Sequence, residues 1–133
     1  MHFDEALQTA ANSVPECVAA GYVDVASGML LAITTVASHP RQVIDMLAAA
    51  TGDLFNGESV SMIERMFKKA RGLQDDYHYF QEIIINSENL LHVFLRGKTN
   101  PEYVAVFVCR KSANLGMALT KARMALPALE AAF

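Results

Sequence analysis

Three apolar runs in the second half of the chain constrain the fold more than any other feature of the sequence. They cover residues 77–86, 90–96 and 103–109, and the polar segments between them are rich in turn-forming residues. This pattern predicts three antiparallel strands joined by two short turns. Several of the runs are apolar on both faces, so we expect helices or a partner chain to cover both faces of the resulting sheet.

The residues before these runs predict one helix and one β-hairpin. Apolar residues recur at helical spacing over residues 3–14, and Pro15 ends that pattern. Residues 17–25 and 29–36 follow as two strand-like runs, and the short turn between them has Gly28 at its end. Such a pair of runs is typical of a β-hairpin.

Two further helical regions flank the three apolar runs. Residues 40–71 show helical spacing, but a glycine inside a helix costs about 1 kcal/mol relative to alanine, so we expect a break near Asn56-Gly57. The last helix begins near Ala113, and Pro127 should kink or end it. The element order is therefore α-ββ-α-βββ-α, which predicts an α+β fold in a single domain over residues 1–133.

The composition argues against several classes of protein. Apolar residues make up 53% of the 133 residues and charged residues 19%, which is unlike a disordered chain. The formal net charge is -3, so we expect no nucleic-acid partner. No run approaches the roughly 20 apolar residues that cross a bilayer, and the N-terminus lacks a signal-peptide pattern, so we expect no membrane insertion and a cytoplasmic location. The apolar content is high for a small domain, which favours a subunit interface.

Motifs that might carry chemistry do not combine into a reactive site. The tripeptide 97–99, Gly-Lys-Thr, resembles the end of a phosphate-binding loop, but the glycine required five residues earlier is replaced by His92. The four histidines lack metal-ligand spacing, and the carboxylates at 75–76 lie in a polar turn. Cys17 and Cys109 lie in apolar runs, where cysteine is usually a buried thiol. We therefore expect no catalytic residue, no cofactor and no metal ion.

Two local motifs in the sequence invite comparison with known domains. Within residues 20–32, Asp24 and Gly28 bracket the hairpin turn before an apolar strand. Residues 114–116, Asn-Leu-Gly, stand at the start of the last predicted helix. Both motifs resemble those of roadblock/dynein light chain domains, in particular the bacterial stand-alone members. The resemblance implies a profilin-like three-layer α/β/α arrangement, in which a central antiparallel five-stranded sheet has the first and last helices on one face and the middle helix on the other.

The resemblance also implies a homodimer, in which the middle helices pair and the strands after them join the two sheets. In this sequence those parts are residues 40–71 and 77–86. The apolar side chains expected at the dimer interface are Val43, Leu47, Ala50, Leu54, Ile83 and Ile85. Family members share no catalytic residues, and they scaffold motor complexes or bind small Ras-like GTPases. The broken stretch 51–59 departs from the usual single middle helix.

A basic cluster ends the middle helical region. Lys68, Lys69 and Arg71 complement the helix dipole, and they also suit contact with an acidic partner surface. The leading hypothesis is a non-enzymatic homodimeric interaction module that regulates or scaffolds a small Ras-like GTPase. The alternative is a small-ligand sensory domain of profilin-like or PAS-like architecture, which requires a concave pocket with convergent polar groups.

Overall fold

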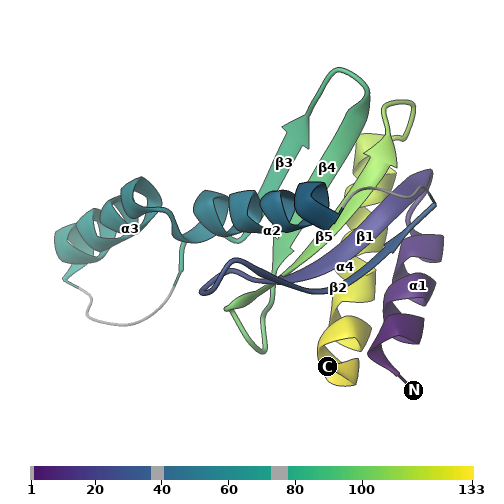
Figure 1. The fold of residues 1–133 in the computed structure, drawn as a ribbon. Coiled ribbons are helices and arrows are strands. Elements are labelled where there is room, and N and C mark those ends of the chain that lie inside the picture. The colour runs from purple at the N-terminus through teal and green to yellow at the C-terminus, as the bar shows by residue number, and fades with distance from the viewer. Residues whose placement is uncertain (1, 37–40, 73–77) are drawn as a thin grey trace.

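The predicted element order is confirmed by a computed structural model, which describes residues 2–36, 41–72 and 78–133 (Figure 1). Side chains are described for these residues except those of residues 41–45. In chain order, the elements are α1 (Phe3–Ser13), β1 (Cys17–Asp24), β2 (Met29–Thr35), α2 (Arg41–Asn56), α3 (Glu58–Arg71), β3 (Glu82–Asn86), β4 (Leu90–Arg96), β5 (Tyr103–Arg110) and α4 (Leu115–Ala132).

The strands form one antiparallel five-stranded sheet in the order β2-β1-β5-β4-β3. The hairpin β1–β2 and the meander β3–β4–β5 join where β1 pairs with β5. This pairing leaves β2 and β3 at the two edges of the sheet. Each edge strand presents backbone groups on its outer side that no described strand pairs.

Helices cover both faces of the sheet, as the doubly apolar strands require. Helices α1 and α4 pack on one face, and α2 lies across the other (Figure 1). Consecutive residues of β4 show the division, because Val93 belongs to the core under α1 and α4 while Phe94 belongs to the core under α2. The chain therefore has the three-layer α/β/α fold that the resemblance to roadblock domains implies.

The middle helical region breaks at Gly57, between α2 and α3. The backbone N–H of Gly57 donates to the Asp53 carbonyl at 2.9 Å. A Cβ atom added at Gly57 would lie 2.5 Å from the same carbonyl oxygen, so only glycine fits this close approach. Beyond the break, α3 extends away from the sheet (Figure 1). The expected two-piece helix is thus present, with the break at the expected position.

Two boundary predictions differ from the structure. The sequence pattern predicts a strand over residues 77–86, but β3 begins only at Glu82, because the backbone at Tyr79 and Phe80 makes contacts with side chains described below. Pro127 does not end α4, which continues to Ala132.

The Gly-Lys-Thr tripeptide lies in the turn between β4 and β5, as expected from the missing loop glycine. The Glu130 carboxylate on α4 accepts hydrogen bonds from the backbone N–H groups of Lys98, Thr99 and Asn100, at 3.1, 2.7 and 3.2 Å. The N–H groups of this turn therefore bind a carboxylate of the same chain.

Candidate functional site

Helix α2 carries an apolar face that points away from the sheet. Its opposite face packs on the body through Ala48 and Phe55, which are buried. Leu47 is 60% exposed, Ala50 is exposed and Leu54 is half-buried at the edge of the core. Because these three residues are spaced three and four apart, they share one face of the helix.

The predicted dimer residues therefore divide into three groups. Leu47 and Ala50 are exposed on the outward face of α2 and Leu54 packs partly against the core, whereas the side chain of Val43 is outside the described ones. On β3, Ile85 is exposed, but Ile83 packs partly against its own core. These placements leave Leu47, Ala50 and Ile85 as the side chains most available to a partner.

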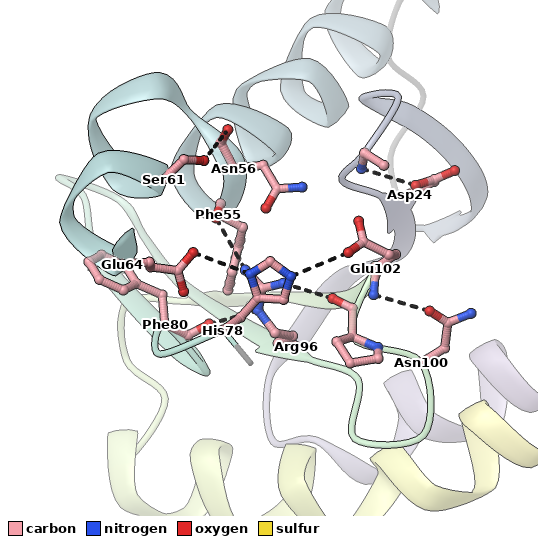
Figure 2. A network of polar contacts seen from close by, with 12 residues as sticks. Asp24, Phe55, Asn56, Ser61, Glu64, His78, Phe80, Arg96, Asn100 and Glu102 are labelled. Carbon is pink, nitrogen blue, oxygen red and sulfur yellow. Dashed lines mark hydrogen bonds and ion pairs between the residues drawn. The ribbon is translucent and has the colours of Figure 1, made fainter. Parts of the chain in front are cut away.

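A buried arginine joins three segments at the end of α2 (Figure 2). Arg96 is only 2% exposed, although it is the last residue of β4. Its guanidinium donates Nε to the Phe80 carbonyl at 2.8 Å, Nη1 to the Pro101 carbonyl at 2.8 Å and Nη2 to the Phe55 carbonyl at 3.1 Å. It also lies over the Phe55 ring, 5.0 Å from the centroid. Arg96 thus ties α2 to the segment before β3 and to the β4–β5 turn.

The electrostatics around Arg96 keep it charged. Burial lowers the pKa of the guanidinium, and the carboxylates of Glu64 and Glu102 act in the opposite direction. Arginine has a pKa so high that it stays protonated in proteins. A charged donor makes stronger hydrogen bonds to carbonyl groups than a neutral one, which offsets the cost of burying it.

Helix α3 is attached to the same junction through a buried carboxylate. Glu64 is the buried residue of α3, and its Oε2 accepts a hydrogen bond from the Tyr79 backbone N–H. Its Oε1 lies 3.2 Å from His78 Nδ1, and His78 Nε2 lies 3.4 Å from Glu102 Oε1 (Figure 2). The Asn100 side chain accepts from the Glu102 backbone N–H at 3.1 Å and fixes that turn. The orientation of α3 is therefore set by the polar contacts of Glu64 and by the edge-to-face contact of the Phe67 and Tyr79 rings, whose centroids are 5.7 Å apart.

A shallow hollow of about 480 Å³ adjoins this junction, lined by Lys68, His78, Pro101 and Glu102. Its size is within the range of small-molecule sites, but those sites are lined mainly by apolar and aromatic side chains. An ammonium group, an imidazole and a carboxylate here suit a polar or charged group of a partner. Among the described residues, no three His, Cys, Asp or Glu side chains are placed to hold a metal ion.

The predicted basic cluster lies at the end of α3. Lys68 lines the hollow, Lys69 is exposed, and the Arg71 guanidinium lies 6.0 Å from the centroid of the Tyr79 ring. Residues 68 and 71 are three apart and share one side of the helix, whereas residue 69 is turned about 100° from residue 68.

Sequence reasoning did not identify Arg96, Glu64 or Glu102, and it considered His78 only as a metal ligand. One local signal for Arg96 exists, because a charged residue ends the apolar run 90–96 directly before Gly97 and the following turn. No local pattern indicates Glu64, because its partners lie 14 and 15 residues further along the chain.

The comparisons with known proteins agree on the fold. No family model and no curated protein matches the sequence. The gliding protein MglB from Thermus thermophilus has a TM-score of 0.69 at 20% identity, over 98% of this chain and 87% of that one. A roadblock/LC7 domain from Streptomyces avermitilis has a TM-score of 0.68 at 11% identity, over 98% and 97%. A structure described as MglB with a tetrameric arrangement has a TM-score of 0.70 at 18% identity, over 98% and 90%. The chain therefore has the roadblock fold, as the resemblance of its two motifs predicted.

Proposed function

We propose that this chain is a non-enzymatic interaction module in the cytoplasm, which forms a homodimer and regulates or scaffolds a small Ras-like GTPase. The observation that carries the proposal is the outward apolar face of α2, where Leu47 is 60% exposed. A helix that buries one face and presents a second apolar face to water has a partner for that second face.

The β3 edge supports self-association of the same kind. Its outer side is not paired with any strand in the described part of the chain, and Ile84 and Ile85 are exposed on it. An unprotected apolar edge favours aggregation unless another strand covers it. A two-fold axis that pairs β3 with the β3 of a second copy also relates the two α2 helices, so both surfaces can contribute to one symmetric interface.

The roadblock fold supports the GTPase part of the proposal, because roadblock domains bind small Ras-like GTPases. One structural neighbour, MglB with a tetrameric arrangement, supports self-association in proteins of this fold. In this chain, the exposed Lys69 and the polar hollow beside Glu102 supply charged groups for a partner surface. No helix in the described part of the chain is long and apolar enough to cross a membrane.

The test is a pull-down from the lysate of the source cell, with the chain immobilised and either GDP or a non-hydrolysable GTP analogue added. We expect a small GTPase to be retained in one nucleotide state, as read by mass spectrometry. Lys69→Glu should reduce the retained amount, whereas Lys98→Glu, also at an exposed lysine, serves as the matched control. Absence of any GTPase from both lanes would contradict the GTPase role, and a metabolite that stabilises the chain in a thermal-shift screen would favour the sensory alternative.

A further inference from the structure

Helix α3 is amphipathic, and its apolar face is exposed. Met62, Ile63 and Met66 occupy this face, which we call the methionine face, and Met66 is 63% exposed. Their spacing of one, three and four residues places them on one side of the helix. Glu64 is the buried residue of α3, and the Phe67 ring contacts the Tyr79 ring with centroids 5.7 Å apart, whereas Met62, Ile63 and Met66 face solvent.

Such a helix gains stability only when its apolar face is covered. α3 has 14 residues, and an isolated helix of this length is marginal in water because most helical stability comes from packing of an amphipathic face. Helix α3 extends away from its own sheet (Figure 1), and the described part of the chain leaves Met62, Ile63 and Met66 exposed. A second molecule is therefore needed to cover this face.

Charge favours a second copy of this chain as that molecule. Helix α3 contains four Lys or Arg residues and two Glu residues, which gives it a charge of +2, so the rest of the chain, with a total of -3, carries -5. A positively charged arm therefore meets a negatively charged body when two copies associate.

The size of interface that a stable dimer needs also favours a contact between α3 and a second copy. Specific interfaces usually contain about 20 to 30 residues on each side. The outward face of α2 and the five residues of β3 fall short of that number, and α3, which directly follows α2 in the chain, supplies further exposed apolar side chains. His78 and Tyr79, which contact α3, lie a few residues before β3, so the arm starts next to the edge strand.

We infer that α3 is a reciprocal arm, which packs its methionine face against the body of the second copy beside the β3 edge. This inference rests on the proposed homodimer and adds a contact that the α2 and β3 surfaces alone do not make. In this arrangement, the Gly57 break and the Glu64 contacts fix the direction in which α3 leaves its own body and so orient it toward the second copy.

The test compares two exposed methionines in the full chain by sedimentation equilibrium. Met66→Glu places a charge on the methionine face, and Met124→Glu does the same on α4, where Met124 is 66% exposed. Since burying a methionine side chain is worth enough to change affinity by a factor of ten or more, we expect the dimer Kd to rise about tenfold or more for Met66→Glu. The Kd of Met124→Glu should remain within about twofold of the wild-type value.

A second measurement uses the wild-type sequence and does not depend on whether a variant folds. Protomers with labelled methionine methyl groups are mixed with protomers carrying a different label, and isotope-filtered NOEs are recorded. NOEs from the Met62 and Met66 methyl groups to the other protomer support the arm. Methyl NOEs confined to the same protomer overturn it.

The α2 variant Leu47→Glu separates failure of this inference from failure of the proposed dimer. A wild-type chain that stays monomeric at high micromolar concentration contradicts both. If Leu47→Glu dissociates the dimer while Met66→Glu behaves like Met124→Glu, the dimer stands and the arm is wrong. If Met66→Glu weakens the dimer and Met124→Glu does not, the arm is supported.

Discussion

At the scale of single residues, Arg96 has the largest structural role in the candidate site. It is almost fully buried, and its three hydrogen bonds go to carbonyl groups that belong to three different segments. A planar guanidinium with donors in fixed directions can reach three separated acceptors, whereas an ammonium group is a compact point donor. The junction therefore depends on the shape of arginine as well as on its charge.

Arg96→Lys should lower the free energy of unfolding by about 2 to 3 kcal/mol, because lysine keeps the charge but leaves buried carbonyl groups without donors. Urea denaturation followed by circular dichroism measures this loss. Arg110→Lys, at an exposed position at the end of β5, is the control and should change stability by less than about 0.5 kcal/mol. Equal effects of the two substitutions would mean that the three carbonyl contacts contribute nothing beyond charge.

At the scale of elements, the connection between α2 and α3 depends on one glycine. Gly57 has φ -57° and ψ 159°, a backbone conformation that any residue can adopt. Glycine is therefore required at this position only because there is no space for a side chain. The nearest atom to an added Cβ is a backbone oxygen, which cannot move without moving the end of α2. The break is therefore a fixed structural feature of the helical region.

Gly57→Ala should destabilise the chain by about 1 to 3 kcal/mol, since the end of α2 has to shift to remove the clash. The same substitution at Gly116 is the matched contrast. There the nearest atom to an added Cβ is the Asn114 side-chain oxygen at 3.4 Å, and alanine favours a helix by about 1 kcal/mol over glycine. Gly116→Ala should therefore leave the urea midpoint unchanged or raise it. A neutral Gly57→Ala would show that α2 and α3 reorient without cost.

The helices and strands are the part of the structure that sequence patterns predicted best. The strands and helices follow from local periodicity, because residues two, three or four positions apart share a face. The helix break follows from the low helix propensity of glycine, and the three-layer order is what the resemblance to roadblock domains implies. The start of β3 could not be found this way, since the Phe80 carbonyl is taken by Arg96, 16 residues away. The contact between Arg96 and Phe55 spans 41 residues. Periodicity carries no information about such distant polar partners, so the candidate junction emerges only from the folded chain.

At the scale of the whole molecule, apolar residues make up 53% of the chain, and the described fold leaves a number of their side chains exposed. They lie on the outward face of α2, on the β3 edge and on the methionine face of α3. A monomer would expose all three surfaces at once, which disfavours the isolated chain in water. If two copies associate as proposed, the dimer covers these surfaces together, and folding and assembly of this chain should be thermodynamically linked.

This linkage makes the melting temperature depend on protein concentration. If the folded state is a dimer and the unfolded state is a single chain, mass action raises Tm by about 2 to 3 °C for each tenfold increase in concentration of a chain this size. Differential scanning calorimetry over a hundredfold range of concentration measures the slope. Leu47→Glu should melt at a lower and concentration-independent temperature, because a charge on the outward face of α2 opposes association while leaving the buried face of that helix intact. A wild-type Tm with no concentration dependence would mean that the exposed apolar surfaces stay uncovered when the chain folds.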